Sequence, residues 1–212
     1  MPYSTPEQLR FPPLPGYTVR ADFDGGALSS DFGALLLRGI DRQIGLTERL
    51  AAAVHDKRHP SYTDHPLRDL FAQRIYQLAS GYADGNDANS LRHAPLFKLS
   101  VERVPLEPTQ DLASAPTFSR LEHSVDRKDI YRLTQAFVDH FIASYPEPPA
   151  AIVLDLDHSE SPTHGQQEFT FYNHHYQSHC YLPLFIFEGT SHALVTACLR
   201  PGKRPPGTEN AM

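Results

Sequence analysis

The sequence has little of two features that would each define a class of protein. It contains two cysteines in 212 residues, Cys180 and Cys198, which we expect to be packed thiols and not a disulfide. No apolar run approaches the roughly 18 to 20 residues of a membrane helix. The first residues, Met1 to Pro6, lack the basic and apolar regions of a signal peptide. We therefore expect a cytoplasmic protein with no membrane partner.

An excess of basic residues is also missing. The chain has 19 Lys and Arg residues against 25 Asp and Glu residues, a formal net charge of −6. Because this balance gives no global attraction to nucleic acid, any DNA binding has to be local. There is also no internal repeat and no low-complexity tract. The length allows a buried core in one large domain or two small ones.

The amino-terminal part of the sequence predicts helices after an extended arm. The first thirty or so residues are rich in proline and contain the turn Asp24-Gly25-Gly26, so they cannot sustain a helix. From residue 31 to about 56, apolar residues recur at three- and four-residue steps broken at Gly45, which predicts two short helices. A further helix is expected from Pro66 to Ala79, stopped near Gly81. Its expected apolar face is Leu67, Leu70, Phe71, Ile75 and Leu78.

Two prolines and a serine shape the expectations for the middle of the chain. Pro95 is expected to interrupt any helix, so residues 91–97 are predicted to be a connector. Ser119 and Glu122 have the spacing of a capping box, which predicts a helix that begins at Ser119. The clearest amphipathic stripe follows and ends before Pro146. The stripe consists of Ile130, Leu133, Phe137, Val138, Phe141, Ile142 and Tyr145.

A change of pattern at Pro146–Pro149 suggests a domain boundary. Beyond it, helical periodicity gives way to three apolar runs, Ala150–Asp157, Tyr181–Glu188 and Ala193–Leu199. The four polar residues between the second and third runs predict an antiparallel hairpin. Residues 158–180 form a polar, aromatic insertion. The predicted fold class is mixed α and β, with a helical region at residues 1–148 and a sheet that starts in residues 149–212.

Two acidic side chains at the end of the first run form the candidate site. Side chains alternate between the two faces of a strand, so Asp155 and Asp157 share one face. Carboxylates at the end of an apolar strand are costly unless they meet a metal, a proton or a positive partner. Their oxygens suit Mg²⁺, and Asp157 is the preferred ligand. The alternative for Asp157 is an ordinary strand-end carboxylate that caps a turn or pairs with Lys or Arg. Glu188, at the end of the second run, is a candidate substitute ligand, and its alternative is a solvated strand-end glutamate.

Several motifs in this order resemble a known family. They are Gln73-Arg-Ile, Gly81-Tyr-Ala-Asp, Leu91-Arg, Pro116-Thr-Phe-Ser-Arg-Leu-Glu122, Val153-Leu-Asp-Leu-Asp157, Pro162-Thr-His-Gly-Gln-Gln167, Cys180-Tyr-Leu-Pro-Leu184 and Leu199-Arg-Pro-Gly202. From about Asp22 to Gly202, the chain resembles the transposases of a bacterial insertion-sequence group that use a DDE catalytic triad on a ribonuclease-H-like fold.

The resemblance implies an activity, cofactors and partners. It implies DNA strand cleavage and transfer with two Mg²⁺ or Mn²⁺ ions held between three carboxylates. Asp157 matches the first acid, with Asp155 as the alternative. DNA is the implied partner, as terminal inverted repeats and target, for a homo-oligomer associated with the nucleoid. Among the implied substrate contacts, His164 and Gln166 lie in the loop beside the metal site. Further candidate DNA contacts are Arg74, Arg92 and Arg120.

The chain departs from the family pattern at its end. The second Asp and the final Glu of the triad come well downstream in this family, and the sequence stops at Met212. We therefore expect an amino-terminal fragment that does not cut DNA alone, since one carboxylate cannot position a metal pair. One alternative is a non-catalytic DNA-binding or regulatory module. Another is an unrelated metal-dependent hydrolase that uses Asp155, Asp157 and Glu188.

A cluster of histidines in the insertion raises the question of a zinc site. His174, His175, His179 and Cys180 carry the right ligand types. All four lie within seven residues, whereas structural zinc sites normally use two separated pairs. We expect solvent-facing or ring-stacked histidines.

Overall fold

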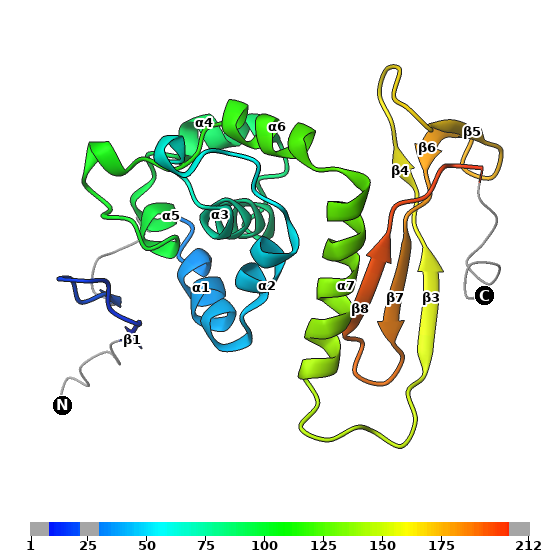
Figure 1. Cartoon of the computed structure of the whole chain (residues 1–212), viewed down its shortest axis with the longest axis horizontal. Helices are drawn as coiled ribbons and strands as arrows, with labels where there is room; N and C mark the ends of the chain where they lie inside the picture. The colour runs from blue at the N-terminus through cyan, green and yellow to red at the C-terminus, as the bar shows by residue number, and fades with distance from the viewer. Residues whose placement is uncertain (1–8, 22–29, 204–212) are drawn as a thin grey trace, which may run out of the picture. The chain divides into compact units, whose positions relative to one another are not determined.

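The computed structural model describes residues 9–21 and 30–203. The chain divides into two compact units, residues 1–126 (the first unit) and residues 127–212 (the second unit). Helices dominate the first unit and antiparallel sheets follow in the second (Figure 1). The predicted mixed α and β class is therefore confirmed.

The first unit contains the helices that the sequence periodicity predicts. Gly45 ends the first helix with a positive φ of 69°, a left-handed conformation that glycine adopts without strain, and the next helix begins directly after it. The predicted helix at 66–79 is also confirmed. The elements are α1 (Gly33–Ile44), α2 (Leu46–Ala53), η1 (Pro60–Tyr62), α3 (Leu67–Ala79), η2 (Gly85–Asp87), α4 (Ala88–Leu91), α5 (Pro95–Ser100), η3 (Pro108–Gln110) and α6 (Ala115–Ser124).

The expected extended arm is described in part. Strands β1 (Leu9–Arg10) and β2 (Arg20–Ala21) pair antiparallel, and Leu14 forms a further bridge with Tyr17. This stretch is therefore extended, as predicted. The predicted turn at Asp24-Gly25-Gly26 lies outside the described residues.

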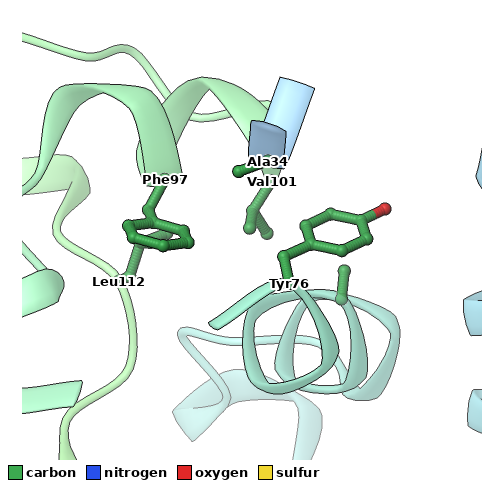
Figure 2. Close-up of a cluster of buried hydrophobic side chains, with 6 residues drawn as sticks. Ala34, Tyr76, Phe97, Val101 and Leu112 are labelled. Carbon is green, nitrogen blue, oxygen red and sulfur yellow. The ribbon is translucent and has the colours of Figure 1, made fainter. Parts of the chain in front are cut away.

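The core of the first unit lies between α1, α3 and α5. Figure 2 shows Tyr76 and Phe97 with Ala34, Val101 and Leu112, and every one of these side chains is at most 2% exposed. The ring of Tyr82 packs edge-on against Phe97, with 5.9 Å between the ring centroids. Full burial of an aromatic side chain such as Phe97 contributes roughly 1.5–3 kcal/mol relative to exposure. This cluster joins α1, α3 and α5, which are separated in the sequence.

Helix α3 turns a partly different face inward than its periodicity predicts. Leu78 is 47% exposed, whereas Gln73 and Tyr76 are buried. The Gln73 amide exchanges two hydrogen bonds with the backbone of Ala113, at 2.8 and 2.9 Å, and the Tyr76 hydroxyl donates to Asp41 at 3.0 Å. Polar side chains that find such partners can be buried at little cost. The periodicity of apolar residues in the sequence does not reveal such buried polar side chains.

Two further sequence predictions in the first unit are wrong. Pro95 begins α5 and does not merely interrupt a helix, because the first helical position needs no donor from its N–H. Ser119 lies inside α6, which starts at Ala115 after Ser114. Its hydroxyl lies 3.4 Å from His123 Nδ1 and forms no capping box. Extended backbone at Val125, with ψ of 129°, then separates α6 from the next helix.

The second unit is a helix packed on a three-stranded antiparallel sheet. Helix α7 (Arg127–Ala143) lies against strand β8 (Leu194–Cys198), and the sheet order is β3-β7-β8, with β3 (Leu154–His158) at one edge and β7 (Leu184–Glu188) in the middle. The three predicted strands and the hairpin are confirmed. Because α7 packs on this sheet, it belongs to the second compact unit, which begins at Arg127.

The insertion between β3 and β7 contains a second small sheet. Strands β4 (Ser161–Pro162), β6 (Ser178–Tyr181) and β5 (Phe171–Asn173) pair antiparallel in that order. Gly202 closes against this sheet, and a Cβ there would lie 2.3 Å from the carbonyl oxygen of Cys180. Asn173 also donates to the Gly202 carbonyl at 2.9 Å. The sequence indicated a polar insertion but not its strands, which are two to four residues long.

Candidate functional site

Strand β3 carries the two candidate acids on one face. Asp155 pairs with Phe187 and Asp157 pairs with Phe185 across the antiparallel ladder, and directly paired residues share a face. The rings of Phe185 and Phe187 are stacked, with 6.3 Å between their centroids. The other face holds Thr196, whose hydroxyl donates to a backbone carbonyl of α7 at 3.1 Å. The acids therefore lie on the sheet face turned away from α7.

Asp157 is an exposed carboxylate with little to hold it in place. Its Oδ1 accepts a hydrogen bond from the adjacent His158 amide at 2.8 Å. Among the described residues, no Lys, Arg or His lies within ion-pair distance of either Asp157 or Asp155. Exposed oxygen donors on one strand face are the chemistry that Mg²⁺ or Mn²⁺ requires, so these two residues fit a divalent metal. Within residues 9–21 and 30–203, however, no group of three His, Cys, Asp or Glu residues gathers to hold an ion.

Glu188 has a different role. It pairs with Leu154 and so lies on the opposite face of the sheet from Asp157. Its carboxylate accepts backbone N–H bonds from Ser191 at 2.6 Å and Thr190 at 3.1 Å, in the turn between β7 and β8. These bonds lower the pKa of Glu188 to about 2, because they favour its charged form. Glu188 caps a turn, and the strand register does not bring it together with the two aspartates.

The loop predicted beside the metal site is exposed. His164 and Gln166 are both exposed, on either side of Gly165, which has a φ of 75°. The loop is closed at its base by Thr163, whose hydroxyl lies 2.6 Å from that of Thr170 and donates to the His179 carbonyl at 3.0 Å. Both predicted side chains are therefore accessible to a substrate, and neither is held against Asp157 by a described hydrogen bond.

The histidines of the insertion contact aromatic rings. His174 and His179 each contact the ring of Tyr172, with centroids 5.1 and 5.5 Å apart, and His175 contacts Tyr176 at 4.7 Å. Cys180 is fully buried and follows His179 on the same strand, so their side chains point to opposite faces. The three histidines therefore lie edge-on against tyrosine rings, with interplanar angles of 83°, 66° and 85°. Both cysteines are free thiols, and Cys198 is exposed, unlike the packed thiol that we expected.

The three candidate arginines separate into two groups. Arg74 donates to the carbonyls of Tyr82 and Ala83, at 3.5 and 3.0 Å, and so anchors the loop after α3. Arg92 and Arg120 instead line one cavity of the first unit, of about 480 Å³. Arg92 lies 3.6 Å from Asp111, and Arg120 donates to the Thr117 hydroxyl at 3.1 Å. The structure therefore brings two of the three predicted DNA contacts together.

Sequence reasoning missed the other wall of this cavity. Arg58, His59 and Tyr62 also line it, from the segment that contains η1. Tyr62 is 86% exposed, and its ring contacts that of His59, with 5.5 Å between the centroids. The signal was available, because residues 55–65 read His-Asp-Lys-Arg-His-Pro-Ser-Tyr-Thr-Asp-His, a local concentration of cationic and aromatic side chains.

The comparison with known proteins identifies one family. The family model described as the transposase DDE domain, group 1, matches residues 11–212. No curated protein and no solved structure matches the chain. Within the described residues, none of the helices is long and apolar enough to span a bilayer. Since the family match covers almost the whole sequence, as the motifs from Gln73 to Gly202 predicted, the chain belongs to the DDE transposase family.

Proposed function

We propose that this chain acts in DNA transposition, as the part of a transposase that supplies the first metal-binding acid and contacts the DNA ends. The activity of the complete enzyme is then Mg²⁺-dependent strand cleavage and strand transfer at the terminal inverted repeats of an insertion sequence. The observation that carries the proposal is the exposed Asp157 on strand β3, with no cationic partner among the described residues, in a chain of this family.

Asp157 would hold the metal, and Asp155 is the alternative on the same face. A divalent ion bound there would supply activation of the attacking hydroxyl and stabilisation of the departing oxygen. The backbone pairing of β3 with β7 fixes the position of the Asp157 backbone and the sheet face that its side chain takes, and the carboxylate itself accepts one hydrogen bond, from the His158 amide. His164 and Gln166 are accessible for contact with substrate phosphate.

We further propose that the 212-residue chain alone does not cut DNA. The described residues place two aspartates on the face of the candidate site and turn Glu188 away from it. Two adjacent carboxylates on one strand do not surround a pair of ions as in-line attack requires. Mg²⁺-dependent nicking of inverted-repeat DNA that disappears in Asp157→Ala would contradict this part of the proposal.

The helical amino-terminal region, residues 1–148, is the proposed DNA-end-binding region, and the first unit makes up most of it. In the complete enzyme it would pair two ends within a homo-oligomer, associated with the nucleoid in the cytoplasm. A competing proposal is a DNA-binding or regulatory module without catalysis, and the arginine-lined cavity of the first unit favours DNA contact in either case. If the wild-type chain binds the DNA ends but binds no metal at Asp157, the competing proposal is favoured.

The metal role of Asp157 is tested by iron-mediated backbone cleavage. Fe²⁺ substitutes for Mg²⁺ and, with ascorbate and peroxide, generates radicals that cut the polypeptide where the ion binds. We expect fragments that end near residues 155–158 in the wild type, suppression by excess Mg²⁺, and loss in Asp157→Asn. Asp139→Asn removes an exposed aspartate on α7 and is the matched control. Identical cleavage in wild type and Asp157→Asn would contradict the assignment.

DNA recognition is tested with the sequences that flank the coding region. We expect a mobility shift with the flanking inverted repeats that weakens steeply with salt, because phosphate contacts release counterions. A shuffled duplex of the same composition is the control. Equal affinity for the two duplexes would contradict recognition of the element ends.

A further inference from the structure

We propose that the cavity of the first unit binds one unpaired nucleotide of DNA, with its phosphate among the arginines and its base stacked on Tyr62. The inference rests on the proposed function only in taking DNA as the ligand. The cavity is formed by η1, by the segment around Arg92 and by helix α6. Its lining is therefore assembled from parts of the chain up to 66 residues apart, Arg58 and Ser124 being the first and last.

The charge of the lining favours an anion. Three guanidinium groups, from Arg58, Arg92 and Arg120, face it against one carboxylate, Asp64. Arg120 has no carboxylate within ion-pair distance among the described residues. The Nε atom of Arg92 is buried and has no hydrogen-bond partner in the described structure. An anion in the cavity could accept charge-assisted hydrogen bonds from these guanidinium groups, and Arg120 has no carboxylate to compete with it.

The positions of Arg58 and Arg92 are fixed by polar groups of the protein. Arg58 pairs with Asp56 at 2.7 Å and donates to the His65 carbonyl at 2.9 Å. Arg92 is held near Asp111. His65 also lines the cavity, and its pKa is lowered by burial and by the nearby cations Arg103 and Arg92. His65 is therefore neutral near neutral pH, and the arginines carry positive charge in the cavity.

The aromatic wall favours a nucleobase over a bare phosphate. Tyr62 is 86% exposed, although a tyrosine ring gains free energy on burial. The His59 ring contacts the Tyr62 ring, and its Nδ1 accepts a hydrogen bond from the Ser61 amide at 3.2 Å. This bond fixes the orientation of the imidazole. An exposed ring beside a row of cations is the arrangement that stacks bases while the backbone phosphate is neutralised.

The size of the cavity selects an unpaired nucleotide. Its volume of about 480 Å³ is in the range of small-molecule pockets, which take single ligands of nucleotide size. A base can enter such a pocket or stack on a side chain only when it has left the duplex. Paired DNA can contact the rim through phosphates but cannot place a base on Tyr62.

The experiment measures binding of the full chain to three labelled DNAs by fluorescence anisotropy. The DNAs are an oligothymidylate, a fully paired duplex, and the same duplex with one extrahelical thymidine. We expect tighter binding of the first and third than of the paired duplex. We also expect Tyr62→Ala to weaken these two about tenfold, whereas Tyr62→Phe, which keeps the ring, stays close to wild type.

Arg120 tests the phosphate contact. Arg120→Ala should reduce the magnitude of the negative slope of log affinity against log salt by about 0.7 for the oligothymidylate. Arg120→Lys should restore the slope because the charge returns. The matched controls are Tyr131→Ala, an exposed tyrosine of the second unit, and Arg49→Ala, an exposed arginine of α2 outside the cavity. Both should bind as the wild type does. All the substituted side chains are exposed, so the variants should fold.

Three outcomes would overturn the inference. The first is an unchanged affinity for the oligothymidylate in Tyr62→Ala, and the second is the same loss of affinity in Tyr131→Ala. The third is tighter binding of oligouridylate than of oligothymidylate, which would assign the cavity to RNA. The result is separable from that for the proposed function. A Tyr62-dependent preference for unpaired DNA without recognition of the flanking repeats supports the cavity and contradicts end binding, and the reverse result contradicts the cavity alone.

Discussion

Asp41 in the first unit and Asp157 in the second are carboxylates with opposite surroundings. Asp41 is 7% exposed and accepts three hydrogen bonds, from the Thr47 amide at 2.9 Å, the Thr47 hydroxyl at 2.6 Å and the Tyr76 hydroxyl at 3.0 Å. Asp157 is exposed and accepts one, from the next residue. A carboxylate saturated by internal donors stabilises the fold, whereas one with free oxygens is available to a ligand.

The same contrast extends to the elements that carry the two acids. Asp41 lies where α1, α2 and α3 meet, and burial together with the Asp41 carboxylate raises the pKa of Tyr76. Strand β3 is the edge of its sheet, and Leu154 is 52% exposed on it. The first unit therefore places its polar groups for stability, while β3 leaves backbone and side-chain groups accessible. Four predictions test this comparison.

The largest expected effect is that of Asp41→Ala. It leaves the Tyr76 and Thr47 hydroxyls buried without their acceptor, so the free energy of unfolding should fall by about 3 kcal/mol. Asp41→Asn keeps one acceptor oxygen and should cost less. Urea denaturation followed by circular dichroism measures both. A loss below about 1 kcal/mol in Asp41→Ala would show that this network contributes little.

A smaller loss is expected from Gly202→Ala in the second unit. The new Cβ would lie 2.3 Å from the Cys180 carbonyl and 3.0 Å from that of Phe171, both backbone atoms that cannot rotate away. Overpacking of this kind costs about 1–3 kcal/mol. The melting temperature should fall, with Gly39→Ala as the control because a methyl group added there would meet nothing within 4 Å. Equal melting temperatures for the two variants would contradict the close packing.

A pH-dependent loss is expected from Glu188. Its pKa is lowered from 4.5 to about 2 by the N–H donors of Ser191 and Thr190. Because the folded-state pKa is below the unfolded one, the stabilisation is complete above pH 4.5 and is lost as the pH falls toward 2. Glu188→Gln should be less stable at neutral pH and should lack this part of the acid sensitivity. Parallel acid titrations of the two proteins that follow identical curves would exclude the cap.

The smallest effect should come from Asp157→Ala. An exposed side chain with one local hydrogen bond should change the free energy of unfolding by less than about 0.5 kcal/mol. The same variant should lose metal-directed cleavage of the polypeptide. Urea denaturation in the presence of a chelator isolates the structural part. A destabilisation comparable to that of Asp41→Ala would mean that Asp157 holds the fold together and would remove the basis of the comparison.

Local pattern was sufficient for most of the elements. The break at Gly45, the helix that ends before Gly81 and the hairpin after Glu188 follow from glycine conformation and apolar periodicity. The sequence predictions were wrong where a residue or spacing is compatible with two different local structures. Pro95 begins a helix as readily as it interrupts one, and the spacing of Ser119 and Glu122 occurs inside α6 by chance. The strands of the insertion were missed because they are two to four residues long and have no apolar alternation.

The candidate site shows the same division between local and distant information. The sequence by itself determined that Asp155 and Asp157 share a strand face, because alternation is a property of the backbone. Only the tertiary structure decided that Glu188 lies on the other face, that Gln73 and Tyr76 are buried, and that Arg58, Arg92 and Arg120 line one cavity. Contacts between residues far apart in the chain depend on how helices and strands pack, and a window of a few residues carries no record of that packing.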